Sequence, residues 1–292
     1  MDRWRNTTLR IRLQGLVACC VLLAACAATV VHEVRSEYSH IRVVDSGSQR
    51  ALYFIGDSDL DVVETQIDLR APHVLQHAYA RTAMAALLYR PQAESCLLIG
   101  LGGGAMVRFL DHHFPRLRLD VVEIDPVVVR VAREYFGTTE SPGTSIHVAD
   151  GREFLQRSVA RFDLILVDAH LHPEVRTDSS GHPLSLKSAA FYASVRARLN
   201  PGGVAMFNLI RGRDADAYVD GIRREFKAIE VYRPAGTANL IVFASAQALA
   251  GEDELRARAR ALDQHGGYGF SFEQLLDARA ASARIQLSVT PS

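Results

Sequence analysis

The strongest constraint on the fold is a continuous apolar strand that runs into a glycine-rich turn. Residues 95–101 read SCLLIGL, and an amphipathic segment follows the glycines. Such a strand is typical of a parallel sheet that is covered on both faces. Strand-like runs recur at LDVVEID, SIHVAD, FDLILVD and GVAMFNL, and helix-like segments separate them at 104–113, 126–136, 151–158 and 186–199. This alternation predicts an α/β fold with a doubly wound, Rossmann-type sheet.

The segments that flank this core depart from simple alternation. Short β-like stretches separated by Gly, Asp and Ser predict a small antiparallel β unit at 36–70. A helical pattern then spans 73–89. Two strands near the C-terminal end, separated only by PAGTA, predict a closing antiparallel hairpin, and 251–279 has a helical pattern. We therefore expect the β unit, an α/β domain at 73–246 and a helical tail at 247–292.

An uncharged apolar segment near the N-terminus predicts membrane targeting. Four arginines and one acid precede LQGLVACCVLLAACAATVV, which is the order of a signal sequence or a short membrane anchor. LAAC within it resembles a bacterial lipoprotein signal, in which Cys26 would carry the lipid, and the alternative is an uncleaved anchor. Either interpretation makes residues 1–31 a targeting segment. It predicts a membrane-associated protein whose soluble domain is periplasmic or otherwise extracytoplasmic.

The charge balance limits the class of partner. Lys and Arg together number 33, as do Asp and Glu, and no long block of basic residues is present. A nucleic-acid-binding protein would be expected to carry such a block or a basic face. We therefore expect a small-molecule partner and no nucleic acid.

Glycines and acids are predicted to gather at one edge of the sheet. Where the first strand meets its helix, a ligand can lie against bare backbone at Gly100, Gly102, Gly103 and Gly104. Acids follow the next strands at Glu123, Asp125, Asp150 and Asp168. Glu123 has the spacing of an acid that binds ribose hydroxyls, and Asp150, before Gly151, suits an adenine amino group. Because carboxylates attract a sulfonium and repel a pyrophosphate, this edge predicts an S-adenosyl ligand.

The order of these motifs resembles the spermidine synthase family of polyamine aminopropyltransferases. The segments that carry the resemblance are CLLIGLGGGAMVRFLDHHFPRLRLDVVEIDPVVVRVAREYF, VADGREFLQRSVARFDLILVDA and FYASVRARLNPGGVAMFNL, preceded by SEYSHIRVV. It covers about residues 36–246, and its central part is shared with S-adenosylmethionine methyltransferases. The resemblance implies a methyltransferase-like sheet, ribose binding by Glu123, adenine contacts from Asp150 and Gly151, and a catalytic role for Asp168. Gln66 matches a glutamine of the family's active-site wall.

Three positions depart from the family pattern in the half of the site that handles the amine. Gly103 stands where the family has an acid in its glycine loop, and Leu171 replaces the second acid of a motif Asp-Ser-Ser-Asp. Leu75 stands where a tyrosine is expected nine residues after the glutamine. Two acids of the following loop, Glu174 and Asp178, are candidates to replace the missing charge. Tyr192 is a candidate substrate contact, or else an aromatic residue of a packed helix.

These observations predict a transferase that moves an aminopropyl group from decarboxylated S-adenosylmethionine to putrescine or another amine. Asp168 is expected to act as the base that orients the amine. Two alternatives stay open: a methyltransferase that uses S-adenosylmethionine, and a non-catalytic nucleoside- or amine-binding protein. His170, His172 and His182 lie in one polar loop and are not expected to bind a metal. A homodimer is a further arrangement that the sequence leaves open.

Overall fold

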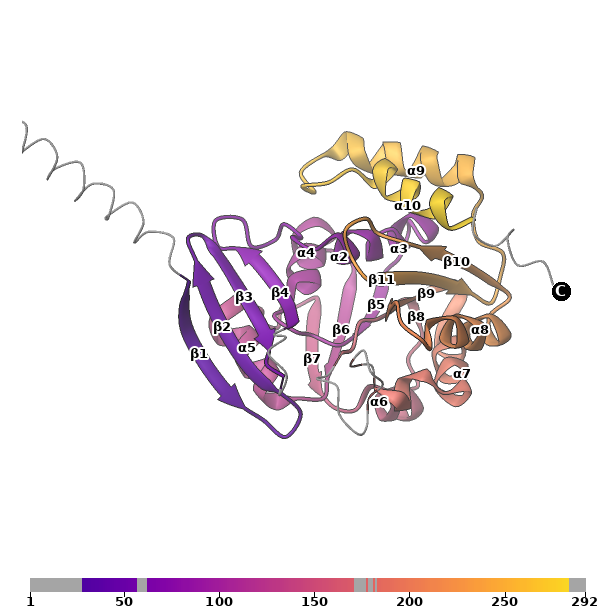
Figure 1. The fold of residues 1–292 in the computed structure, drawn as a ribbon. Coiled ribbons are helices and arrows are strands. Elements are labelled where there is room, and N and C mark those ends of the chain that lie inside the picture. The colour runs from indigo at the N-terminus through magenta and orange to yellow at the C-terminus, as the bar shows by residue number, and fades with distance from the viewer. Residues whose placement is uncertain (1–27, 57–61, 171–176, 178–180, 182, 284–292) are drawn as a thin grey trace, which may run out of the picture.

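The computed structural model describes residues 28–56, 62–170, 177, 181 and 183–283. Two sheets lie side by side in it, an antiparallel one from the N-terminal part of the chain and a larger one with helices on both faces (Figure 1). The larger sheet and its helices are the α/β core. The smaller sheet lies against the edge at which the ligand-binding strand ends are expected.

The antiparallel sheet has the strand order β1-β2-β3-β4. Its strands are β1 (Thr29–Arg35), β2 (His40–Ser46), β3 (Gln49–Phe54) and β4 (Val62–Asp68). The pairing of β3 with β4 shifts once, because Leu52 is opposite Thr65 while Tyr53 is opposite Val63. Glu64 is therefore the extra residue of a β-bulge, which locally re-aims side chains.

The larger sheet has the order β10-β11-β9-β8-β5-β6-β7. Its strands are β5 (Ser95–Ile99), β6 (Arg118–Glu123), β7 (Thr144–Val148), β8 (Phe162–Val167), β9 (Leu199–Ile210), β10 (Ala228–Tyr232) and β11 (Asn239–Ser245). Strands β7, β6, β5, β8 and β9 are parallel, and β11 pairs antiparallel with both β9 and β10. The predicted fold class, a methyltransferase-like α/β sheet with a small antiparallel unit and a closing hairpin, is confirmed.

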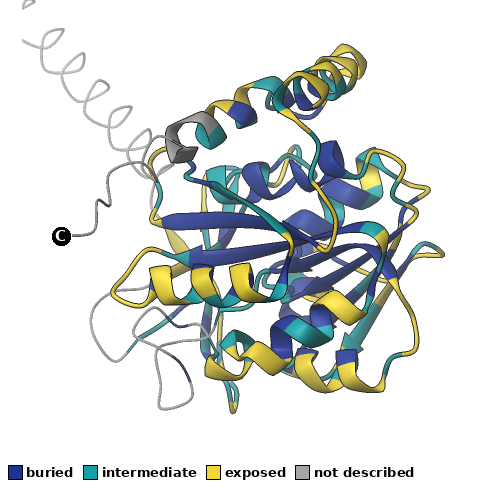
Figure 2. Cartoon of the chain, turned by 90° about the vertical axis from the view of Figure 1, so that its right-hand side faces the viewer, coloured by how far each residue is buried: buried dark blue, intermediate teal, exposed yellow. Residues whose placement is uncertain are grey.

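The helices cover the two faces of the larger sheet and leave its strands buried (Figure 2). Alternate residues of one strand serve opposite faces: Cys96 and Leu98 pack on one side of β5, and Leu97 and Ile99 on the other. The first side carries α2 (Ala78–Ala83), α3 (Ala86–Tyr89), α4 (Ala105–His113), α5 (Pro126–Phe136), α9 (Glu252–His265) and α10 (Phe272–Ala283). The second carries α6 (Gly151–Arg157), α7 (Ala189–Ala197) and α8 (Ala215–Glu225), and a short 3-10 helix (Leu184–Lys187) precedes α7.

Two predicted helices differ in extent from the observed ones. The helix expected over 73–89 begins only at Ala78 and is interrupted between α2 and α3. The helical tail expected over 251–279 consists of α9 and α10, separated at Gly266 and Gly267, both of which have positive φ. The apolar periodicity predicted which residues of these helices are buried. It did not predict the points at which each helical segment is interrupted.

The membrane-targeting interpretation needs correction. The expected segment ended at residue 31, but β1 already begins at Thr29 and pairs with β2, so its last residues belong to a sheet. Within the described part of the chain, no helix has the length and apolar character needed to cross a membrane. The expected membrane-anchored, extracytoplasmic form is withdrawn, because the segment assigned to it extends into a strand of the folded sheet. Cys26 and the rest of residues 1–27 lie outside the described residues.

Candidate active site

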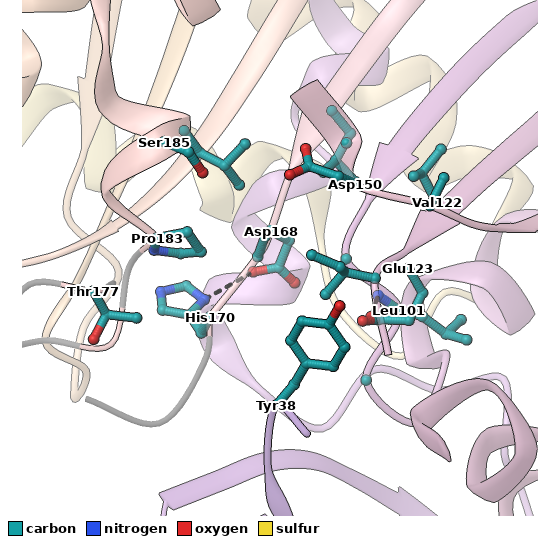
Figure 3. Close-up of a pocket in the computed structure, with 18 of the residues that line it drawn as sticks. Tyr38, Leu101, Val122, Glu123, Asp150, Asp168, His170, Thr177, Pro183 and Ser185 are labelled. Atoms are coloured by element: carbon teal, nitrogen blue, oxygen red, sulfur yellow. Dashed lines mark hydrogen bonds and ion pairs between the residues drawn. The ribbon is translucent and has the colours of Figure 1, made fainter. Parts of the chain in front are cut away.

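A cavity of about 420 Å³ opens at the carboxyl ends of the central parallel strands (Figure 3). Backbone and side chains at the ends of β5, β6, β7 and β8 form its floor. The antiparallel sheet closes another side with Tyr38, Phe54 and Glu64, and the segment before α7 contributes Thr177 and Ser185. This volume is in the range of cavities that bind small organic ligands. The site is therefore built between the two sheets.

The glycine turn divides into two glycines that face the cavity and two that do not. Gly100 and Gly102 line it, and both have positive φ. A Cβ on Gly100 would overlap the Asp168 carbonyl oxygen, so glycine is required there. Gly103 and Gly104 were also predicted to contact ligand, but neither lines the cavity. They allow close packing instead, because a Cβ on Gly103 would meet Thr65 and a Cβ on Gly104 would meet Thr138.

Glu123 is the acid predicted to bind ribose hydroxyls, and the structure places it at the cavity. It ends β6 and is 8% exposed. Its carboxylate accepts hydrogen bonds from the backbone N–H groups of Leu101 at 2.9 Å and Asp125 at 3.0 Å. Burial raises the pKa of Glu123, and these backbone bonds act in the opposite direction. The two N–H groups fix the carboxylate while one side of it faces the cavity.

Asp125 serves the fold and not the cavity, contrary to the prediction. Its side chain is fully buried and does not line the cavity. One carboxylate oxygen caps α5 by accepting from the Val127 N–H at 2.8 Å, and the other accepts from the Ser36 hydroxyl. Asp125 thus joins the start of α5 to the turn between β1 and β2.

Asp150 and Gly151 both line the cavity where β7 leads into α6. One oxygen of the Asp150 carboxylate caps α6 by accepting from the Arg152 N–H at 2.7 Å. A Cβ on Gly151 would lie 2.5 Å from the Ile99 side chain, so glycine lets α6 approach β5 closely. The pair therefore presents backbone and a carboxylate at the position predicted for adenine.

Asp168, directly after β8, is a cavity acid whose carboxylate has several polar neighbours. Its Oδ1 accepts from Asn208 Nδ2 at 2.7 Å, and Asn208 Oδ1 in turn accepts from Asn239 Nδ2 at 2.8 Å. The Tyr79 hydroxyl, 3.5 Å from the Glu64 backbone carbonyl oxygen to which it donates, lies near enough to Asp168 to favour its ionised form. His170 Nδ1 lies 3.8 Å from the same carboxylate (Figure 3). Burial raises the pKa of Asp168 to about 6, against the opposing effect of the Asn208 and Tyr79 hydrogen bonds.

Glu64 and Tyr79 are cavity residues that the sequence analysis missed. The bulge residue Glu64 lines the main cavity and an adjoining chamber of about 30 Å³, which Tyr79 and His77 also line. Burial, followed by the negative charges of Asp168 and Glu123, raises the pKa of Glu64 to about 8. Tyr79 supplies a hydroxyl beside Asp168. The family pattern has a tyrosine at the position of Leu75, so the sequence analysis had counted this hydroxyl as missing.

Three of the residues expected near the amine lie elsewhere. Gln66 does not line either of these cavities, and its amide lies 3.3 Å from the Gln49 side chain. Leu75 lines only the small chamber and is almost fully buried in the core. Tyr192 is 1% exposed and packs edge-on against Phe207 beneath α7 and α8, so it is a core aromatic residue.

Several candidate residues fall in parts of the loop after Asp168 that the structure does not describe. They are Leu171, His172, Glu174, Asp178 and His182. The role predicted for Glu174 therefore stays a prediction. His170 is described and faces the cavity (Figure 3).

The described lining residues of the cavity include five acids and no basic Lys or Arg side chain. The acids are Glu37, Glu64, Glu123, Asp150 and Asp168. A cation gains from such surroundings, and an anionic group is repelled. The arrangement suits a positively charged ligand.

Comparison with known proteins shows which enzymes the chain resembles. Residues 77–209 match the model of the spermine/spermidine synthase domain. A polyamine aminopropyltransferase of Vibrio vulnificus is 27% identical over 242 residues, which are 80% of this chain and 78% of the relative. A bovine eEF1A lysine and N-terminal methyltransferase is 31% identical over 204 residues, but the match spans 65% of this chain and only 29% of that protein.

Comparison with solved structures shows a similar fold over nearly the whole chain. The structure of a probable spermidine synthase from Corynebacterium glutamicum superimposes with a TM-score of 0.67 at 20% identity, covering 90% of this chain and 96% of that one. The likeness includes the antiparallel sheet as well as the α/β core. Through residues 77–209 and these aminopropyltransferase relatives, the chain is similar to enzymes of the spermine/spermidine synthase family.

Proposed function

We propose that the enzyme transfers an aminopropyl group from decarboxylated S-adenosylmethionine to an amine, with Asp168 as the group that receives the amine proton. The acidic lining around Asp168 is the observation that carries this proposal. The donor has a sulfonium and an ammonium group and no carboxylate, and the acceptor is a cation before it reacts. Every charge on the two substrates is therefore of the sign that the cavity attracts.

The reaction requires a neutral amine beside the sulfonium. Aliphatic amines have pKa values near 10, so the acceptor arrives as an ammonium ion and must lose a proton. Asp168, ionised above about pH 6, takes that proton and passes it to solvent. The nitrogen lone pair then forms a bond to the methylene carbon next to sulfur, and the carbon–sulfur bond breaks toward sulfur. The products are the extended amine, as an ammonium ion, and neutral methylthioadenosine.

Asn208 and Tyr79 keep Asp168 available for this step. Their hydrogen bonds favour the ionised carboxylate, and the Asn208–Asn239 contact fixes which side of the amide faces it. Glu64 supplies a further carboxyl next to Asp168, in a half of the site where the sequence showed acids to be missing. We assign Glu64 to the ammonium group of the donor.

Methyl transfer from ordinary S-adenosylmethionine is the second candidate. The methyltransferase relative, and the absence of an acid at Gly103, favour it. Ordinary S-adenosylmethionine carries a carboxylate, however, and no described lysine or arginine of the cavity would balance it. The site therefore supports aminopropyl transfer better.

A product assay separates the two reactions. The purified full chain is incubated with either donor and a panel of linear diamines and polyamines. We expect methylthioadenosine to form from the decarboxylated donor with at least one amine. Formation of S-adenosylhomocysteine from the ordinary donor, with no methylthioadenosine, would instead identify a methyltransferase.

Replacement of Glu64 tests its assigned role. Because the pKa of Glu64 is raised to about 8, binding is measured near pH 9, where its carboxylate is charged and an aliphatic ammonium still holds its proton. There we expect Glu64→Gln to weaken binding of decarboxylated S-adenosylmethionine by about tenfold or more, because a charged hydrogen bond contributes about 1.5–3 kcal/mol. Binding of methylthioadenosine, which has the same nucleoside and no charge, should change little. Isothermal titration calorimetry with both ligands measures the difference, and Gln66→Ala, on the same strand but outside the cavities, is the control. Equal weakening of both ligands would remove Glu64 from ammonium recognition.

A further inference from the structure

Three histidines meet at a place remote from the catalytic cavity. His73 lies in the loop after β4, and His112 and His113 are the last two residues of α4. Since α4 begins at the glycine turn and runs away from it, its final residues are on the far side from Asp168. None of the three lines the catalytic cavity.

The three side chains are close enough to share one ion. Their ligand atoms lie within 4.8 Å of one another. The rings of His73 and His112 are stacked with centroids 3.9 Å apart, and the His113 ring meets His112 edge-on at 4.6 Å. The His113 ring also has ring contacts with His73 at 5.7 Å and with Phe109 and Tyr268.

One ring nitrogen in this group, Nε2 of His113, is buried without a hydrogen-bond partner in the described structure. Buried polar atoms in folded proteins nearly always have a partner, so an orphaned nitrogen calls for an explanation.

We propose that His73, His112 and His113 form a binding site for one divalent transition-metal ion, with zinc the best match. Three neutral imidazoles suit zinc, copper or nickel and do not suit magnesium or calcium, which prefer oxygen ligands. Zinc–nitrogen bonds of about 2.0–2.1 Å place ligands of a tetrahedral ion roughly 3.4 Å apart. The site must therefore contract, and the exposed His112 ring must turn out of its stack on His73. Solvent occupies the fourth position.

The position of the site indicates a structural role. It connects the loop that leaves the antiparallel sheet to the end of α4, and the C-terminal segment packs beside both. Tyr268 contacts His113, and a Cβ on Gly269 would lie 2.7 Å from Val74, the neighbour of His73. An ion held here would join three segments far apart in the sequence. Because it binds the folded state, it would raise the melting temperature.

Metal binding to the full chain tests the proposal without any measurement of activity. Protein stripped with a chelator, and then freed of it, is titrated with zinc chloride by calorimetry and melted with and without zinc. We expect one high-affinity site and a rise in melting temperature of at least about 3 °C. Cobalt(II) in place of zinc should give the visible absorption of a tetrahedral ion.

Variants locate the ion. His112→Ala removes an exposed ligand and should leave the fold intact while weakening zinc binding at least tenfold and abolishing the melting shift. His73→Ala and His113→Ala should do the same, and His265→Ala, an exposed histidine of α9, should bind zinc like the parent. Unaltered zinc affinity in both His73→Ala and His112→Ala, or absence of a high-affinity site in the parent, would overturn the proposal.

Discussion

Asp168→Asn is expected to lower turnover by about 10²–10⁴-fold, the usual contribution of a positioned general base. Asparagine has the same shape and keeps an oxygen that can accept from Asn208, so the cavity should stay intact. It cannot take a proton from the amine. Release of methylthioadenosine measures the rate, and calorimetry with methylthioadenosine shows whether the nucleoside still binds.

The pH dependence gives the same prediction a second readout. Because burial raises the pKa of Asp168 to about 6, the carboxylate form needed for proton removal is present above pH 6 and lost below it. The kcat/KM of the parent, which reports the free enzyme, should therefore fall as the pH decreases through 6, and the matching limb of kcat, which reports the complex with a cationic amine, should lie lower. The residual activity of Asp168→Asn should lack the limb. A variant that retains more than about a tenth of the parent rate with the same pH profile would exclude Asp168 as the base.

Glu123→Ala is expected to weaken every S-adenosyl ligand by about tenfold to a hundredfold. The lost contacts are charge-assisted hydrogen bonds to ribose hydroxyls, each with a contribution of about 1.5–3 kcal/mol. Methylthioadenosine and decarboxylated S-adenosylmethionine share this ribose, so both should weaken together, unlike the selective effect expected of Glu64→Gln. Removal of the carboxylate also leaves the N–H groups of Leu101 and Asp125 without their acceptor, so some loss of stability is expected.

Asp125→Asn is the matched control for this experiment. Asp125 is two residues away, but it caps α5 and does not line the cavity. Its replacement should lower the melting temperature and leave nucleoside affinity nearly unchanged. Unchanged affinity in a folded Glu123→Ala protein, judged by circular dichroism and calorimetry, would contradict the proposed nucleoside site.

Much of the fold could be predicted because buried strands are marked in the sequence by runs of apolar residues. The strands of the larger sheet are covered on both faces, so β5 and β8 are continuous apolar runs with clear ends. Parallel strands then bring their carboxyl ends to one edge, which is why Glu123, Asp150 and Asp168 could be placed together without a structure. The start of α2 could not, because His77 offers no side-chain cap and the apolar pattern extends before it.

The errors at the site have a common physical origin. A side chain near the end of a strand can face a ligand or satisfy the local backbone, and its residue type does not decide between them. Asp125 precedes Pro126 at the start of a helix, which is the arrangement of a helix cap, and it serves as one. Tyr79 lies in the first turn of α2 and lines the same small chamber as Asp168, a tertiary arrangement that no spacing rule in the sequence would have located.

Glu64 illustrates how pocket charge can depend on the spacing of residues as well as on their identity. It is the one unmatched residue where β4 passes β3, while Gln66 pairs normally with Ala51 two positions later. Loss of a single residue at this point would restore regular pairing and move the carboxylate away from Asp168, although the catalytic acids themselves would be untouched. Within a lineage, donor preference could thus change through one-codon insertions and deletions in a peripheral strand, leaving the nucleoside-binding core under separate selection.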